Sequence, residues 1–337
     1  MKLLVIKLSS LGDLFHALPA VHQLKTGLSA EVHWVVNAEY VSLVRQFTDV
    51  DRVVPFPRHD GLRAIAGFVK QLRQTPYDLV VDLQGLLKSA WIARVARAAR
   101  RIGPSFHREG SRLLYDAVAG PRNKQRHAVE ENLDVVRYLG LPAGEPVFPV
   151  ACPVPDLPPD RPRVAMVCSS RWATKNWPPE GFAEVARRLQ ATCDASIFLV
   201  GGSDSRAVHE RIRTRLSGKV TDLAGRCTLV ETLGVLNAMD LVVANDTGPI
   251  HMAAAVGTPV LALFGPTDPV RTGPFGPMHR VVQAGLPCQP CFSRTCRRGG
   301  VPCMEGITPE RVVEAAIAML EKAPSRGSLQ GGFNAGG

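Results

Sequence analysis

The sequence contains no apolar run of the roughly 20 residues that a membrane-spanning helix requires. It also has no secretory signal at its start. Met1 leads directly into the apolar segment 2–6, without a basic beginning, an apolar core and a small-residue cleavage site. We therefore expect a cytoplasmic protein without a membrane anchor.

Two nucleotide-binding signatures are missing. The segment after the first predicted strand lacks the three spaced glycines of a dinucleotide fingerprint. It also lacks the Gly-Lys-Ser/Thr ending of a phosphate-binding loop. These absences argue against an epimerase or a dehydrogenase built on a dinucleotide fold.

What the chain does contain is a regular alternation of short apolar segments and amphipathic segments. Strands are predicted at 2–6, 32–36, 53–56, 77–83, 163–167 and 195–200, and helices at 41–47, 62–74, 181–192 and 309–322. Such alternation predicts parallel sheets covered by helices on both faces. Eight prolines crowd 142–162, so we expect a connection there between an N-terminal domain, 1–155, and a C-terminal domain, 160–322. The Ser-Gly-Asn-rich residues 323–337 are predicted to be a disordered tail.

Polar residues follow two apolar segments that we expect to be neighbouring strands, 241–244 and 259–263. In open α/β sheets, ligands bind beyond such strand ends. Asp246 favours hydrogen bonds from sugar or ribose hydroxyls, while Thr247 and Gly248 offer donors to phosphate at a helix start. His251 offers another donor. A plain helix cap formed by Asp246 and Thr247 is the structural alternative.

The segment Ser9-Ser10-Leu11-Gly12-Asp13 follows the first strand. Asp13 has two interpretations there. It is either a helix N-cap or a general base that takes a proton from an acceptor hydroxyl. His16, three residues further on, shares a helix face with Asp13 and would orient an acceptor, although a plain surface histidine is the more common case.

A second polar segment, 168–178, follows the first strand of the C-terminal half. Ser169, Ser170 and Lys175 suit a diphosphate, because the ammonium neutralises its charge without a metal ion. The structural alternative is a polar surface loop.

The net charge of +10 is concentrated in one stretch. Residues 88–126 hold ten basic and two acidic residues, a local balance of +8. This stretch is either a solvated basic helix or a surface for a phosphate- or carboxylate-bearing partner, and an anionic membrane also fits. Nucleic acid is the weaker interpretation, because few aromatic residues are available to stack on bases.

Four of the eight cysteines fall close together, as Cys288, Cys291, Cys296 and Cys303. Their ligand type suits structural zinc, but their spacing departs from that of paired Cys-X2-Cys sites. A structural loop or free thiols are therefore favoured over zinc, and the reducing cytoplasm disfavours disulfides.

Taken in order, these segments resemble the lipopolysaccharide core heptosyltransferases of glycosyltransferase family nine. The resemblance rests on 7–13, 82–90, 175–178, 245–251 and 264–269. It implies a GT-B fold, in which two Rossmann-like, doubly wound parallel-sheet domains face a central cleft. The implied reaction is inverting transfer of heptose from ADP-heptose to the Kdo/heptose inner core, with heptosyltransferase I favoured over heptosyltransferase II or another family member.

The resemblance also implies roles for individual residues. Asp13 matches the catalytic base, and Cys227 falls where the family lines the adenine pocket. The donor site would comprise Ser169, Ser170, Lys175, Cys227, Asp246, Thr247, Gly248 and His251. The resemblance places the acceptor in the first half, where we expect the acceptor site to comprise Ser9, Ser10, Gly12 and His16 together with Lys88, Arg100, Arg101, Arg122 and Arg126 of the basic stretch. No cofactor is expected, and the enzyme would work on the cytoplasmic face of the inner membrane; a non-enzymatic basic membrane-binding protein is the remote alternative.

Overall fold

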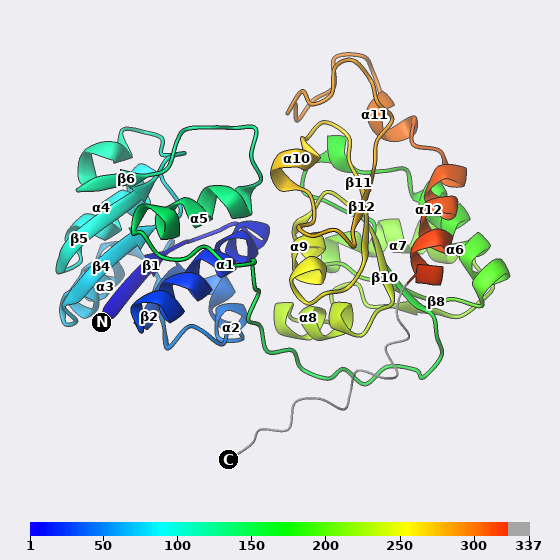
Figure 1. Cartoon of the computed structure of the whole chain (residues 1–337). Coiled ribbons are helices and arrows are strands. Elements are labelled where there is room, and N and C mark those ends of the chain that lie inside the picture. Colours follow the sequence, from blue (N-terminus) through cyan, green and yellow to red (C-terminus); the bar gives the residue numbers. More distant parts are fainter. Residues whose placement is uncertain (323–337) are drawn as a thin grey trace. The chain divides into compact units, whose positions relative to one another are not determined.

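The computed structural model describes residues 1–322. The chain folds into two compact units, with the boundary after Cys152 (Figure 1). Unit 1 comprises Met1–Cys152 with Val270–Thr272, and unit 2 comprises Pro153–Pro269 and the chain from Gly273 onward. The tail predicted at 323–337 lies outside the described residues.

Unit 1 is built on six parallel strands in the order β3-β2-β1-β4-β5-β6. The strands are β1 (Lys2–Ile6), β2 (Glu31–Asn37), β3 (Arg52–Phe56), β4 (Tyr77–Asp82), β5 (Ala98–Pro104) and β6 (Ala117–Ala119). The helices are α1 (Leu11–Leu28), η1 (Ala38–Tyr40), α2 (Val41–Val44), α3 (Gly61–Arg73), α4 (Leu87–Val95), η2 (Ser111–Leu114) and α5 (Ala128–Tyr138).

Helices cover both faces of this sheet (Figure 1). On one face, Phe68 and Leu72 of α3 and Ile92 of α4 join a core with Leu4 and Ile6 of β1. On the other face, α1 packs along α5. The central strands are buried on both sides, which explains why they are continuously apolar in the sequence.

Unit 2 repeats the same strand order, read as β12-β11-β10-β7-β8-β9. Its strands are β7 (Arg163–Val167), β8 (Ser196–Leu199), β9 (Val220–Asp222), β10 (Leu241–Asn245), β11 (Val260–Leu263) and β12 (Arg280–Val282). Its helices are η3 (Ala173–Lys175), α6 (Pro179–Cys193), η4 (Ser203–Ser205), α7 (Arg206–Arg213), α8 (Leu229–Asn237), α9 (Gly248–Ala255), α11 (Pro302–Glu305) and α12 (Pro309–Lys322). The short helix α10 (Pro269–Thr272) begins at Pro269, and its other three residues group with unit 1. Helices α6, α7 and α12 share one core with the sheet.

The predicted α/β class with parallel sheets is confirmed, and β10 and β11 are neighbours, as the sequence predicts. The basic stretch 88–126 is not the single solvated helix of the structural alternative. It contains α4, β5, η2 and β6. Among residues 1–322, no helix combines the length and apolar character needed to cross a bilayer.

In each unit the strand order reverses beside the first strand. The first strand of unit 1, β1, pairs with both β2 and β4, and the first strand of unit 2, β7, pairs with both β8 and β10. Ligands of doubly wound sheets bind at this switch point, beyond the carboxyl ends of the strands. The fold therefore predicts one site after β1 and β4, and a second after β7 and β10.

Candidate functional site

Asp13 lies in the first turn of α1, at the switch point of unit 1. Its Oδ2 accepts hydrogen bonds from the backbone N–H and the hydroxyl of Ser10, at 2.9 and 2.8 Å. Its Oδ1 lies 3.9 Å from Nδ1 of His16. The side chain is 42% exposed. Ser10 is the N-cap residue of α1, so the interpretation of Asp13 as the N-cap is wrong. Asp13 is the third helical residue and completes a capping box with Ser10, while its carboxylate still reaches solvent, as a general base requires.

His16 is buried rather than lying on the surface, with 3% of its area exposed. Its ring packs edge to face on His127, with the ring centroids 5.3 Å apart. Its backbone carbonyl accepts a hydrogen bond from the side chain of Asn132 on α5 at 3.3 Å. These contacts fix the ring beside Asp13.

Gln84 holds the loop that carries Asp13, a role that the sequence did not reveal. Its Oε1 accepts hydrogen bonds from the backbone N–H groups of Leu8 and Ser9, at 3.0 and 3.2 Å. Gly85 follows with φ +71°, a conformation that favours glycine and turns the chain after β4. The end of β4 therefore supports the loop after β1, between Leu8 and the start of α1. The pairing of β1 with β4 could have revealed this role, because it brings the residues that follow the two strands together.

Two buried charged side chains lie beneath this loop. Lys7 Nζ donates to the carbonyl of Leu83 at 2.6 Å, and Asp82 accepts from the Tyr115 hydroxyl at 2.6 Å. Burial lowers the pKa of Lys7, an effect opposed by the carboxylates of Asp13 and Asp82. Burial raises the pKa of Asp82, against hydrogen bonds led by that of Tyr115. The network therefore places the buried amino group of Lys7 at the carboxyl end of β4, directly before the loop that leads to Asp13.

In unit 2, Asn245 at the end of β10 connects the two loops of the switch point. Its Nδ2 donates to the carbonyl of Cys168 at 2.8 Å, and its Oδ1 accepts from the backbone N–H of Trp177 at 3.0 Å. Within the loop after β7, the Ser170 backbone N–H donates to Asn176 Oδ1 at 2.7 Å. The loop 168–177 is therefore fixed against β10 at both ends.

Lys175 and Asp246, predicted separately, form an ion pair. Lys175 Nζ lies 2.6 Å from Asp246 Oδ2, which also accepts the Thr267 hydroxyl at 2.5 Å. The exposed fractions of the two side chains are 17% and 6%. The ammonium also lies 4.7 Å from the ring centroid of Trp172, whose ring is contacted by Arg294 as well. Two cations therefore gather around one aromatic ring at this loop.

The remaining donor-site candidates lie at the start of α9, in the loop after β7 and in the segment before α8. Thr247 precedes α9 in extended conformation, Gly248 is its first residue, and His251 is buried in its first turn. Ser169 lies in the loop after β7, and its buried Oγ has no hydrogen-bond partner among the described residues. Cys227 lies between β9 and α8, where burial raises the pKa of its thiol.

Several basic acceptor-site candidates have partners within unit 1. Arg100 donates to the Tyr138 hydroxyl at 2.9 Å, and Arg101 donates to the carbonyls of Ala93 and Ala96, both at 3.0 Å. Arg126 forms an ion pair with the buried Asp134 at 2.5 Å. The ammonium of Lys88 lies over the Phe56 ring, and Arg122 is exposed in the loop before α5. The acceptor role of all five stays a prediction.

The four clustered cysteines line one pocket of unit 2, of about 430 Å³. Cys288 and Cys291 are exposed, Cys296 is half-buried and Cys303 is buried. Burial raises the pKa of the Cys303 thiol, and the other three cysteines add to the shift. Within residues 1–322, no group of three or more Cys, His, Asp or Glu side chains is arranged to hold a metal ion.

Two Rossmann-like sheets, each with polar side chains at its switch point, match the GT-B architecture of solved heptosyltransferases. Residues 65–301 match the model of glycosyltransferase family 9 (heptosyltransferase), and the chain belongs to that family. It is therefore a glycosyltransferase.

Similar proteins and solved structures agree with this family assignment. Lipopolysaccharide heptosyltransferase 1 of Pseudomonas aeruginosa is 31% identical, over 95% of this chain and 98% of its own. E. coli heptosyltransferase WaaC with ADP is 25% identical, with a TM-score of 0.76 over 95% of this chain and all of that chain. The same enzyme with ADP-2-deoxy-2-fluoro heptose is 26% identical, with a TM-score of 0.74 over 94% and 99%.

Proposed function

We propose that this enzyme transfers heptose from ADP-heptose to the Kdo region of the lipopolysaccharide inner core, as a heptosyltransferase I. The observation that carries the proposal is the exposed Asp13 carboxylate at one switch point, together with a fixed, cationic loop at the other. The similarity to heptosyltransferase 1 over nearly the whole chain supports the first heptose as the one transferred.

Asp13 would act as the general base. Its carboxylate takes the proton of an acceptor hydroxyl while that oxygen attacks the anomeric carbon of the donor, which inverts the configuration at that carbon. The backbone N–H and hydroxyl of Ser10 hold Oδ2, and Gln84 holds the preceding loop. The base is thus fixed before the acceptor arrives, and this lowers the entropic part of the barrier.

The loop 168–177 and the start of α9 would hold ADP-heptose. An ammonium has three N–H donors. One can serve Asp246 while others reach the diphosphate, whose charge grows as it departs. The hydroxyls of Ser169 and Ser170 and the amides at the start of α9 add donors. Asp246 would position Lys175 and accept sugar or ribose hydroxyls, with Cys227 near the adenine.

Changing Asp13 to Asn tests the proposal. Asn keeps an acceptor oxygen for Ser10 but is not a base. We expect ADP-heptose affinity to remain and transfer to fall by a factor of about a hundred to ten thousand. Calorimetry and product mass spectrometry measure the two quantities. Asp60→Asn is the matched control, because it makes the same change at an exposed aspartate that precedes α3 and makes no side-chain cap hydrogen bond; it should leave transfer unchanged. Near-normal turnover of Asp13→Asn would reduce Asp13 to a helix cap.

The identity of the acceptor has its own test. With ADP-heptose as donor, the enzyme should convert Kdo2-lipid A and leave its monoheptosylated form unchanged. The opposite preference would assign the second heptose instead. Because both acceptors are anchored in the inner membrane, the enzyme would act at the cytoplasmic surface of that membrane.

A further inference from the structure

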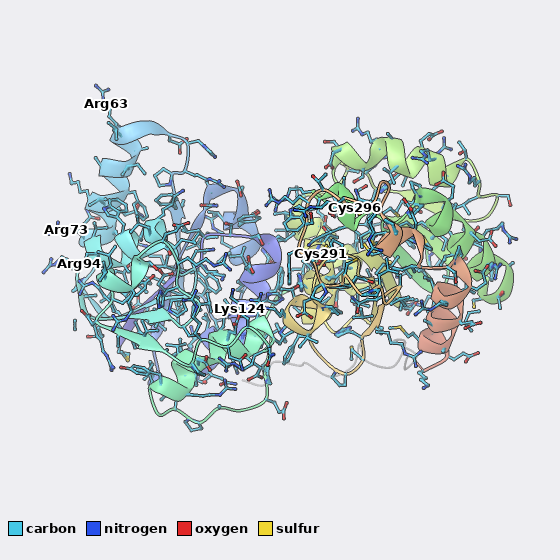
Figure 2. The ribbon with its side chains drawn as sticks, turned by 90° about the horizontal axis from the view of Figure 1, so that it is seen from above. Arg63, Arg73, Arg94, Lys124, Cys291 and Cys296 are labelled. Carbon is cyan, nitrogen blue, oxygen red and sulfur yellow. The ribbon has the colours of Figure 1, made fainter. Side chains whose placement is uncertain are left out.

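Helices α3 and α4 share an unusual composition. The stretches 61–73 and 87–97, which cover both helices and the two residues after α4, contain six basic residues and no acidic one. The basic residues are Arg63, Lys70, Arg73, Lys88, Arg94 and Arg97, and all six are exposed. Within the described chain, none of the six forms an ion pair. Figure 2 shows Arg63, Arg73 and Arg94 directed outward along one edge of unit 1.

The basic helices of unit 2 provide a contrast. There, Arg187 pairs with Glu184, Arg211 with Glu180, and Arg213 with Glu210. Those cations are neutralised locally, and their surface has little net charge to offer a partner. The charge of α3 and α4 is uncompensated, so it attracts an anionic partner.

Apolar side chains are interspersed with these cations. Leu62 is 89% exposed, Leu87 50% and Trp91 37%. Leucine and tryptophan beside lysine and arginine are typical of helices that lie in a membrane interface, where the ring and the apolar chains enter the headgroup region. A single exposed tryptophan is a poor platform for stacking bases, so a bilayer fits this surface better than nucleic acid does.

A pocket of about 710 Å³ lies at one end of the two helices. Four arginines line it, Arg73, Arg94, Arg97 and Arg101, with Asp78 as the one acidic lining residue. The carboxylate of Asp78 accepts the backbone N–H of Lys2 at 2.7 Å. Guanidinium groups bind phosphate through paired hydrogen bonds, so this pocket suits a phospholipid headgroup.

We propose that this exposed face of α3 and α4, the α3–α4 surface, docks on anionic phospholipids. The inference deepens the proposed function, on which it rests for the lipid-anchored acceptor. Helix α4 begins at Leu87, three residues after Gln84, whose side chain holds the Asp13 loop. The start of α4 therefore lies at the carboxyl end of β4, near the Asp13 loop, whereas the arginine-lined pocket lies at the other end of the two helices, beside Tyr77 and Ala98, the first residues of β4 and β5.

The test compares vesicles of phosphatidylcholine with vesicles of equal parts phosphatidylcholine and phosphatidylglycerol, by co-sedimentation of the whole protein without donor or acceptor. We expect binding to the anionic vesicles only, weakened by added salt. The triple variant Arg63→Gln/Arg73→Gln/Arg94→Gln should bind about a hundredfold more weakly, since each basic residue near an anionic surface contributes roughly a factor of five. Leu62→Ser should weaken the binding that persists in salt.

The matched control is Arg187→Gln/Arg211→Gln/Arg213→Gln, which removes the same charge from unit 2. It should bind vesicles like the unmodified protein. Equal losses in both triple variants, no loss in the first, or a preference for duplex RNA over anionic vesicles would overturn the proposal. Transfer to a deacylated, soluble acceptor distinguishes a failure of the membrane-docking proposal from a failure of the proposed function. The triple variant should retain that transfer, whereas failure of the unmodified protein to transfer would refute the proposed function while vesicle binding stands.

Discussion

At the scale of single residues, Asp246 makes more contacts than its position in the sequence suggests. Its Oδ2 accepts a hydroxyl from Thr267 and pairs with Lys175, and the residue is almost fully buried. A buried carboxylate that loses its cation is costly, because the charge stays without compensation. Asp246 is therefore tied to Lys175 for stability, in addition to the donor-binding role proposed for both residues.

This coupling leads to a prediction for Lys175→Met. It should lower the free energy of unfolding by roughly 3 kcal/mol, because the buried Asp246 loses its ion-pair partner. Adding Asp246→Asn should restore most of that loss without restoring ADP affinity. Urea unfolding and calorimetry with ADP measure the two effects. If the double variant loses as much free energy of unfolding as the sum of the losses in Lys175→Met and Asp246→Asn, the two residues are not coupled.

The sequence predicted the residue types at both switch points but not their pairing. Lys175 and Asp246 are 71 positions apart in the sequence, and only the adjacency of β7 and β10 brings them into an ion pair. The burial of His16 likewise depends on α5, which the apolar pattern of α1 does not reveal. Contacts between distant segments are set by topology, which local patterns do not contain.

At the scale of elements, the loop after β1 depends on its neighbour β4. Gln84 accepts two backbone N–H groups from that loop, and Gly85 gives the turn its shape. A loop held by a side chain that follows the neighbouring strand is fixed by the sheet itself. If Asp13 is the base, as proposed, the segment after β4 would contribute to catalysis by holding this loop.

Gln84→Ala should therefore lower kcat by roughly tenfold or more through displacement of Asp13, with little change in ADP-heptose binding. Gln71→Ala, on the exposed side of α3, is the matched control and should leave kcat unchanged. Steady-state kinetics with both substrates separates the effect on kcat from the effect on the KM for ADP-heptose. A normal kcat in Gln84→Ala would show that the loop keeps its shape without this contact.

Some elements followed from the sequence and others did not. Strand β7 and helix α12 have their predicted bounds, because each is a clear apolar pattern. The stretch 88–126 was interpreted through its charge, which hid β5 with Arg100 and Arg101 among its residues. An edge region of a sheet tolerates charged side chains, and charge alone does not distinguish such a strand from a solvated helix.

At the scale of the whole molecule, donor binding should protect one unit. If the donor site is the one proposed, ADP should slow hydrogen exchange at 168–177 and 245–251, while direct protection at 8–16 and 82–89 stays absent. Mass spectrometry of peptides from the whole protein, with and without ADP, tests this. Protection first at 8–16 would move the nucleotide to unit 1 and reverse the assignment of the substrates.

The two units use one strand order twice, and the residues proposed for the donor lie in one uninterrupted span, 169–251. Because of that continuity, the span can be inherited as a unit. Substitutions in the N-terminal half could then change the acceptor, while the residues proposed to bind the nucleotide sugar stay the same. A chimaera joined near residue 153 would use the same modularity in the laboratory.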